Sequence, residues 1–346
     1  KNPDPPRQTS PRPSPSSARI PAQAQSGDAN RVAPITAPLA PALPRPAPPA
    51  VPPAARPDTF PRPARNTFEL QVALEGYAIS AGSIDGVRGS QTRAAIAAFQ
   101  RLTGQPEATS LAATSLVQVT LSAPPLTRYI VTSNDLARLQ PVAPTWLGKS
   151  QQSALDYETA LELVAEKFHA HPSYIRTLNP GINWSNGVAA GTELRVPNVA
   201  YPEPAEKAAF VRISLAAKTL EAFGANSNLL AHFPCSIAAR VEKRPVGELR
   251  VTAIAPNPNY TFDPAVFPES AEAQTLGRKL ILPPGPNNPV GVAWISLDKP
   301  SYGLHGTPHP EQVGRTESHG CFRLANWNAE YLLKLVSAGT PVVVEP

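Results

Sequence analysis

The sequence predicts a multidomain chain, with a mainly-β domain at its C-terminal end, two small modules before it and a disordered, proline-rich N-terminal segment. Three observations support this prediction. Nineteen of the 44 prolines among the 346 residues lie in residues 1–66. Helical spacing of apolar residues follows in residues 67–121 and recurs in 122–200. Residues 207–346 consist mostly of short alternating or apolar runs separated by Gly, Pro and Asn, which is typical of β-strands.

Residues 1–66 are predicted to be a disordered Pro/Ala/Arg-rich linker. They contain one Phe and no Trp or Tyr, which is too little apolar surface for a core. Nine Lys and Arg and three Asp give this segment a net charge of +6, so the rest of the chain carries −1 of the total +5. The folded part therefore lacks the basic face of a nucleic-acid-binding domain, and we expect no nucleic-acid partner. Contact of the arginines with an anionic polymer or membrane surface is the alternative to a plain spacer.

The length of apolar runs, the first residue and the number of cysteines indicate how the chain relates to membranes and export. No apolar run approaches the roughly 18 residues that a membrane span requires, so we expect no transmembrane segment. The first residue is Lys rather than Met, so we expect a mature form or a fragment; an exported, mature form would have lost a signal peptide before residue 1. Two cysteines in a chain of this length exclude a disulfide-scaffolded mini-protein.

Residues 67–121 are predicted to form a three-helix module. The first helix ends at Gly76, a turn follows at Ile84-Asp85-Gly86, and Ser90 is a candidate N-cap for a second helix ending at Leu102. A third helix is expected near Leu111–Leu116. The pattern resembles the peptidoglycan-binding type 1 module, and a generic three-helix bundle is the alternative. The residues that carry the resemblance are Leu70-Gln71, Leu74, Gly76-Tyr77, Ile84-Asp85-Gly86, Gly89, Thr92, Ala95 and Phe99-Gln100.

Residues 122–200 are predicted to follow the order strand, helix, helix, strand. The predicted elements are a strand at Arg128–Thr132, helices at Tyr157–Phe168 and from Pro172 to Asn179, and a strand within Gly191–Pro197. This order resembles the LysM domain, with Ala165-Glu166-Lys167-Phe168, Leu178-Asn179-Pro180 and Gly191-Thr192 as matching pieces. The sequence departs from LysM where a long segment, Ser133 to Asp156, replaces a Gly-Asp-Thr turn. Both a spacer and a working sugar-binding module remain open.

Residues 207–346 form the predicted mainly-β domain with one helix near its end. Asn326 or Asn328 is a candidate N-cap, and Gly339 is expected to end this helix. A Pro- and Asn-rich stretch, Pro256 to Pro289, is expected to form a lid or rim over a cleft. The predicted strands lie within Phe210–Ser214, Phe233–Ile237, Leu249–Ile254, Val292–Ser296 and Val342–Val344.

The chemistry is predicted to lie in the segment before that helix. A cysteine attacks a carbonyl as its thiolate and needs a base, and His is the side chain best suited to that role near neutral pH. His305 lies sixteen positions before Cys321, a spacing that suits two neighbouring β-elements joined by a loop. Gly320 allows a close backbone approach, so that N–H groups can face a developing oxyanion.

This segment resembles the active site of the L,D-transpeptidase (YkuD-like) catalytic domain, and the resemblance extends over the whole C-terminal domain from residue 207 to residue 346. The matching residues are His305, Ser318, His319, Gly320, Cys321, Arg323 and Asn326. The resemblance implies that Cys321 is the nucleophile, His305 its general base, and that His319, Gly320 and Cys321 line the oxyanion hole, largely through backbone N–H groups. It also implies substrate binding by Ser318, Arg323 and Asn326, the last two positioning the stem peptide or bracing the loop.

The same side chains allow other roles. Two His and one Cys could bind zinc, but no fourth ligand stands at a suitable spacing, so no metal and no organic cofactor is expected. A buried structural Cys321 and an inactive family member are the remaining alternatives. Cys235 sits in an apolar run and is expected to be a core residue. His309 lies between His305 and Cys321 and is a candidate substrate contact.

The resemblance implies a peptidoglycan L,D-transpeptidase that is periplasmic or associated with the cell wall. Cys321 would form a thioester with the third residue of a stem tetrapeptide and release D-Ala. An amine would then take the acyl group, giving a 3-3 cross-link or, with an outer-membrane protein as acceptor, a wall-anchored protein. The expected partners are peptidoglycan stem peptides and glycan. A hydrolytic L,D-carboxypeptidase or trimming enzyme and a catalytically inactive wall-binding scaffold are the alternative functions.

Overall fold

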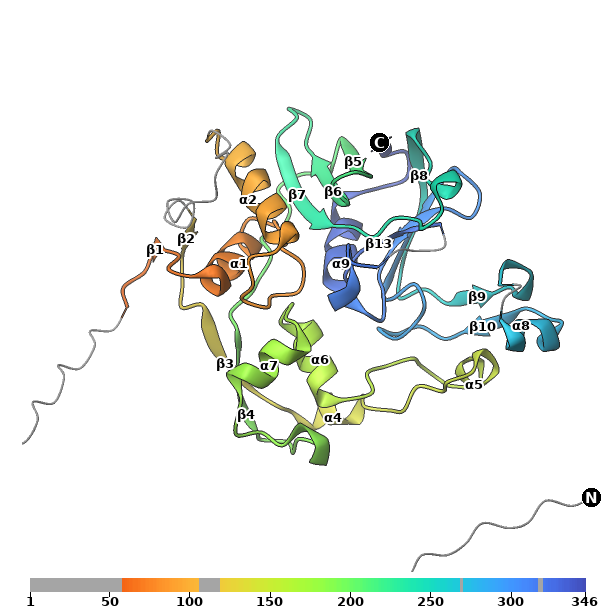
Figure 1. Cartoon of the computed structure of the whole chain (residues 1–346), viewed down its shortest axis with the longest axis horizontal. Coiled ribbons are helices and arrows are strands. Elements are labelled where there is room, and N and C mark those ends of the chain that lie inside the picture. Colours follow the sequence, from red (N-terminus) through yellow and green to blue (C-terminus); the bar gives the residue numbers. More distant parts are fainter. Residues whose placement is uncertain (1–57, 106–118, 268–269, 317–319) are drawn as a thin grey trace, which may run out of the picture. The chain divides into compact units, whose positions relative to one another are not determined.

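The computed structural model describes residues 58–105, 119–267, 270–316 and 320–346 (Figure 1). Residues 56–346 cluster as one unit, so the predicted modules pack against each other rather than standing apart. The predicted linker up to residue 57 and the third helix at Leu111–Leu116 lie outside the described residues.

Two helices form the core of the N-terminal module, α1 (Thr67–Glu75) and α2 (Ser90–Leu102). The side chain of Asn66 accepts a hydrogen bond from the N–H of Glu69, which caps α1, and Gly89 rather than Ser90 is the N-cap of α2. The predicted turn between the helices is present, because the side chain of Gln71 hydrogen bonds to Asp85 and to the N–H of Gly86.

The folded module begins before Asn66, where the sequence predicted a linker. A short strand, β1 (Arg62–Pro63), pairs with β2 (Thr120–Leu121). The guanidinium of Arg62 forms two hydrogen bonds with the carboxylate of Glu69 on α1, at 2.7 and 2.8 Å. This buried ion pair holds β1 against α1, and proline content alone does not predict it.

The middle segment, residues 122–200, has the predicted order of strands and helices. Strand β3 (Leu126–Ile130) pairs antiparallel with β4 (Glu193–Pro197), and α6 (Ala160–Lys167) and α7 (Pro172–Leu178) lie between them in the chain. The insertion that departs from the LysM pattern contains two short helices, α4 (Ser133–Ala137) and α5 (Trp146–Ser150).

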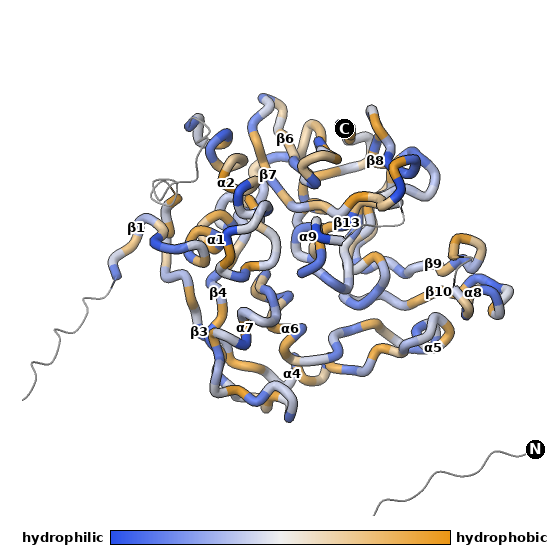
Figure 2. The backbone as a smooth tube through the Cα atoms, in the orientation of Figure 1, coloured by the Kyte–Doolittle hydropathy of each residue, from blue (hydrophilic) through white to orange (hydrophobic). Residues whose placement is uncertain are grey.

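The C-terminal domain is built on an eight-stranded mixed sheet with the order β13-β12-β11-β8-β14-β5-β6-β7. Helix α9 (Asn326–Leu335) packs on the sheet through Ala329, Leu332 and Leu335. Figure 2 shows hydrophilic and hydrophobic stretches alternating along the backbone. The strands are β5 (Phe210–Ser214), β6 (Thr219–Phe223), β7 (Leu229–Pro234), β8 (Gly247–Pro256), β11 (Ala293–Leu297), β12 (Gly303–His305), β13 (Phe322–Arg323) and β14 (Pro341–Glu345).

Both predicted ends of α9 need correction. The N-cap is Ala325, so neither Asn326 nor Asn328 caps the helix with its side chain. The helix ends at Leu335, and Gly339 lies beyond it in a turn with a φ of 92°. Asn326 is unavailable as a cap because its amide hydrogen bonds to groups outside the helix, as described below.

The predicted lid is a small unit between β8 and β11, and residues 260–282 are called the flap from here on. It contains β9 (Tyr260–Phe262) paired with β10 (Leu280–Leu282), a 3-10 turn (Pro264–Val266) and α8 (Ala271–Leu276). Figure 1 shows α5 of the middle segment beside β10 and α8. The insertion into the LysM-like pattern therefore packs against the flap.

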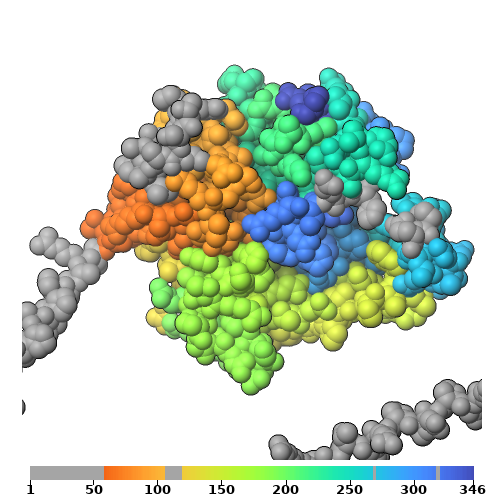
Figure 3. Space-filling view, viewed as in Figure 1, coloured from red at the N-terminus to blue at the C-terminus, as the bar shows by residue number. Residues whose placement is uncertain are grey.

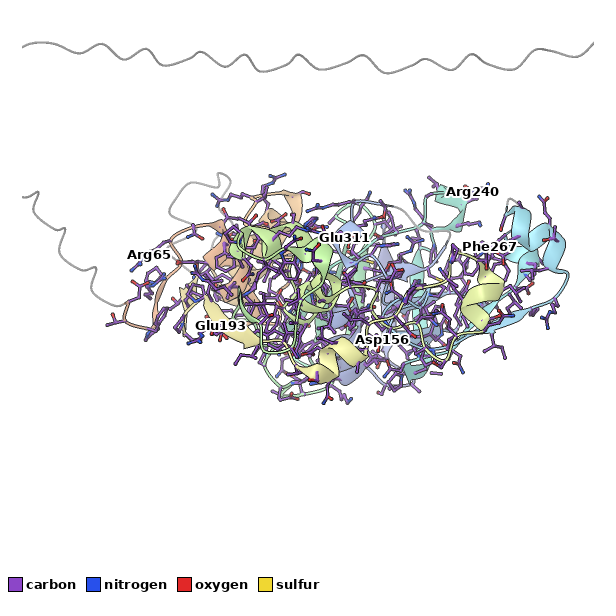
Figure 4. All side chains as sticks on the ribbon, turned by 90° about the horizontal axis from the view of Figure 1, so that it is seen from below. Arg65, Asp156, Glu193, Arg240, Phe267 and Glu311 are labelled. Atoms are coloured by element: carbon purple, nitrogen blue, oxygen red, sulfur yellow. The ribbon has the colours of Figure 1, made fainter. Side chains whose placement is uncertain are left out.

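Trp146 is the main contact between the insertion and the flap. Its ring stacks on Phe262 with centroids 4.3 Å apart and also contacts Phe267, which is labelled in Figure 4. The carboxylate of Glu272 accepts hydrogen bonds from the N–H groups of Trp146 and Leu147, both at 2.8 Å. One acidic side chain of the flap thus satisfies two backbone donors at the start of α5.

Trp146→Ala should loosen the flap. We expect a loss of roughly 1–3 kcal/mol in its local stability, because a half-buried aromatic contact is removed. Hydrogen exchange of residues 260–282 measures this, and Ile281→Ala, at a flap residue that is 65% exposed, is the control. Equal exchange in the two variants would contradict the role of Trp146.

Candidate active site

The sheet brings the two principal candidate residues to adjacent strands. β12 and β13 are parallel neighbours, with Leu304 opposite Phe322 and His305 opposite Arg323. Side chains alternate between the two faces of a strand, and Leu304 and Phe322 are both buried in the core. His305 and Arg323 therefore project from the other face, and Cys321 directly precedes β13.

The thiol of Cys321 lies half-buried at the start of β13. Its Sγ–H donates a hydrogen bond to the carbonyl oxygen of Ser301 at 3.4 Å. Burial raises the pKa of Cys321, while the backbone of Gly303 and the positive charge of Arg323 act in the opposite direction. Near neutral pH this cysteine is therefore a thiol rather than a preformed thiolate.

The imidazole of His305 is held from two sides. Its Nδ1 is 2.6 Å from the carbonyl oxygen of Gly306, so Nδ1 carries the proton and Nε2 is left as the basic nitrogen. The ring stacks on Trp294 with centroids 5.5 Å apart, and the indole N–H of Trp294 donates to the hydroxyl of Ser296. A Cβ on Gly303 would lie 2.6 Å from the same indole, so glycine makes room for this stack.

The electrostatics of His305 keep it neutral. Burial lowers its pKa to about 4, the Gly306 carbonyl opposes this shift, and the charge of Arg323 adds to it. A neutral imidazole beside a neutral thiol is the starting state for general-base catalysis. Arg323 thus affects both reacting groups through its charge, in addition to any contact with substrate.

Asn326 is buried, and its side-chain amide is hydrogen bonded to backbone groups near His305. The side chain is 1% exposed, and its Oδ1 accepts hydrogen bonds from the N–H groups of Thr307 at 2.9 Å and Val292 at 3.4 Å. A Cβ on Gly291 or Gly306 would lie 2.0 or 2.1 Å from Oδ1. The amide therefore occupies a slot that two glycines leave open.

The other predicted site residues divide into two groups. Ser318 and His319 lie outside the described residues. Gly320 is described, and a Cβ placed there would meet nothing within 4 Å, which leaves space beside Cys321 for a substrate. His309 is exposed and precedes a 3-10 turn (Pro310–Gln312).

Cys235 is a core residue, as the sequence predicted. It is completely buried, forms no disulfide with Cys321, and burial raises its pKa far above the usual value. Its neighbour Ser236 pairs with Arg323 through two backbone hydrogen bonds, at 2.9 and 3.0 Å. The Cys235 strand thus supports β13 without supplying a second nucleophile.

Three aromatic residues of the site were not predicted from the sequence. Trp294 packs on His305, and the charge of ionised Cys321 contributes to the raised pKa values of Tyr260 and Tyr302, after burial in each case. Tyr260 is the first residue of β9, so the flap borders the thiol. The Trp294–Ile295–Ser296 alternation was a signal for a strand, but its pairing with His305 was not evident before the sheet order was known.

A cavity of about 650 Å³ lies between the middle segment and the C-terminal domain. Its walls include Tyr157, Glu166, His169, Pro286 and Trp327, but Cys321 is not among them. It is therefore separate from the nucleophile. Within the described residues, no cluster of His, Cys, Asp and Glu is arranged to hold a metal ion.

The site thus holds a buried, neutral histidine on β12 and a half-buried thiol directly before β13. Residues 208–344 match the L,D-transpeptidase catalytic domain family, YkuD, and residues 65–109 match the family described as "Putative peptidoglycan binding domain". The C-terminal part of the chain is therefore an L,D-transpeptidase catalytic domain, and the N-terminal helical module is of the peptidoglycan-binding type.

The chain also resembles individual L,D-transpeptidases over part of its length. It is 26% identical over 186 residues to "Putative L,D-transpeptidase YkuD" of Bacillus licheniformis, which is 54% of this chain and 93% of that protein. The protein of the same name from Bacillus subtilis is 25% identical over 53% of this chain and 92% of its own length. An L,D-transpeptidase structure from Mycobacterium smegmatis aligns at 18% identity and a TM-score of 0.32, covering 46% of this chain and 75% of that one.

Among the described residues, no helix has the length and apolar character of a membrane span.

The neutral state of His305 predicts the pH dependence of acylation. Because its pKa is lowered to about 4, the imidazole stays unprotonated, and hence basic, as the pH falls from 7 towards 5. The rate of Cys321 acylation by a carbapenem should change little over that range and fall only near pH 4. Circular dichroism at each pH checks that the chain stays folded, and an acid limb centred between pH 6 and 7 would contradict the prediction.

Proposed function

We propose that this enzyme acts on the tetrapeptide stems of peptidoglycan and transfers the acyl group of their third residue, a diamino acid, to an amine. The observation that carries the proposal is the placement of His305 on β12 and of Cys321 directly before its paired neighbour β13, within an L,D-transpeptidase catalytic domain. The helical module at residues 65–109 supports peptidoglycan as the polymer that is bound.

Acylation begins at the thiol. Nε2 of His305 takes the Sγ proton of Cys321, and the sulfur attacks the carbonyl carbon of the third stem residue. The resulting oxyanion is stabilised by backbone N–H groups at Gly320 and Cys321. When the tetrahedral intermediate collapses, the C–N bond to D-Ala breaks, the imidazolium returns its proton to the leaving amine, and a thioester remains.

Transfer follows the same path in reverse. An acceptor amine attacks the thioester carbonyl and gives its proton to His305, the C–S bond breaks, and the sulfur regains a proton. The product is a 3-3 cross-link when the amine belongs to another stem. It is a protein attached to the wall when the amine belongs to an outer-membrane protein. With water as acceptor the same thioester is hydrolysed, so the acceptor decides between transferase and L,D-carboxypeptidase.

The accessory modules extend this proposal to location and binding. A periplasmic or wall-associated enzyme needs to stay close to an insoluble polymer, and linked binding modules raise its effective concentration there. The N-terminal helical module supplies such binding. The middle segment has the strand and helix order of a LysM domain, which supports a second contact with glycan.

Purified full-length enzyme incubated with disaccharide-tetrapeptide should release D-Ala and give 3-3 linked dimers, detected by mass spectrometry. Cys321→Ala should give neither product, because it removes only the attacking sulfur. Cys235→Ala should keep most turnover and lower stability by on the order of 1 kcal/mol. Release of D-Ala without dimers would support the hydrolase, and activity that survives in Cys321→Ala would exclude this cysteine as the nucleophile.

His305→Ala tests the general base. Acylation of Cys321 by a carbapenem should slow by about 10²–10⁴-fold, because the thiol loses the group that takes its proton. His171→Ala, at the N-cap of α7 in the middle segment, is the matched control and should acylate at the wild-type rate. If His305→Ala reacts as fast as the wild type, the base would have to be His319.

A further inference from the structure

Glu166 connects the middle segment to the catalytic domain. It lies on α6, outside residues 208–344, and its two carboxyl oxygens accept hydrogen bonds from Nδ2 of Asn326 at 3.1 and 3.0 Å. The hydroxyl of Tyr157 donates to the same carboxyl at 3.1 Å. Figure 3 shows the middle segment, in yellow and green, lying directly against the surface of α9 in blue.

The carbonyl end of the Asn326 amide binds backbone N–H groups close to the proposed general base, His305. Oδ1 holds the N–H of Thr307, two residues after His305, and the N–H of Val292, two residues before Trp294. His305 and Trp294 are register partners and stack on each other. Asn326 thus fixes the backbone on both sides of the imidazole.

An amide has a donor end and an acceptor end, and only one orientation suits this slot. Oδ1 must face the two backbone N–H groups, so Nδ2 must find acceptors on the other side. Those acceptors are the carboxyl of Glu166 and the carbonyl oxygen of Pro286 at 3.3 Å. Without Glu166, a donor in a residue that is 1% exposed would keep one long hydrogen bond.

We propose that Glu166 is a positioning residue for the general base, since it orients the Asn326 amide that holds the backbone around His305. The proposal rests on the proposed function, in which His305 activates Cys321. It makes the middle segment a part of the catalytic apparatus in addition to any binding role.

The proposal needs an acceptor oxygen at this position and does not need a negative charge. Burial raises the pKa of Glu166 to about 8, although the hydrogen bonds from Asn326 and Tyr157 favour the ionised form and the nearby acids Glu162 and Glu330 disfavour it. The carboxyl group is therefore mostly neutral at pH 7, while the side chain as a whole remains half-buried at the edge of the cavity. A glutamine has the same shape and offers the same acceptor.

The test compares Glu166→Ala with Glu166→Gln in the full-length chain. Carbapenem acylation of Cys321 should be about 10–100-fold slower in Glu166→Ala, since small misplacements of a catalytic group cost up to about 10²-fold. Glu166→Gln should stay within about threefold of the wild type. Glu193→Ala, which removes an exposed carboxylate on β4 of the same segment (Figure 4), should have no effect.

A second measurement separates positioning from loss of structure. NMR titration of the His305 imidazole should give a pKa near 4 in the wild type and in Glu166→Gln, and a value closer to 6.5 in Glu166→Ala, where the ring is less firmly buried. Wild-type acylation in a folded Glu166→Ala variant would overturn the proposal, as would a Gln variant as slow as Ala. If the wild type itself formed no adduct, the proposed function would fail, and the titration alone would still decide whether Glu166 positions His305.

Discussion

The first turn of α9 is the place where the parts of this chain depend on each other. Three successive side chains there take partners from outside the catalytic domain: Asn326 from Glu166, Trp327 from the ring of His169, and Asn328 from the hydroxyl of Tyr201. Buried polar groups without partners cost free energy, so the middle segment stabilises this turn through the amide of Asn326. The turn begins five residues after Cys321, which places this contact close to the candidate nucleophile in the chain.

Burial sets the protonation states of His305 and Cys321. His305 is 5% exposed beneath Trp294, and its pKa falls because charge is disfavoured there. The same surroundings keep Cys321 protonated at rest. A thiol is less reactive towards oxidants and alkylating agents than a thiolate. In the proposed mechanism the sulfur becomes a strong nucleophile only as Nε2 of His305 takes its proton during attack on a bound carbonyl. The site thus combines a protected resting state with a base that is available over a wide pH range.

Residue types and spacing predicted that the segments of His305 and Cys321 form neighbouring β-elements, and β12 and β13 are paired strands that follow each other in the chain. The sequence could not predict the hydrogen bonds between Asn326 and Glu166, because the two residues are 160 positions apart and meet only where two modules dock. Tyr260 and Trp294 were not predicted either, because Tyr260 comes to the site with the flap and Trp294 through the pairing of β11 with β12. The end of the linker was misplaced because Arg62, within a proline-rich run, is paired with Glu69.

The insertion between the first strand and helix of the LysM-like segment has a physical explanation. Its α5 provides Trp146 to the flap, whose Tyr260 borders the thiol, while α6, directly after the insertion, provides Glu166 to the side of the site that holds His305. The middle segment therefore contacts the flap and also Asn326, which holds the backbone near His305. A module that only bound glycan would need neither contact. Residues 133–156 are then the part of the middle segment that joins it to the flap.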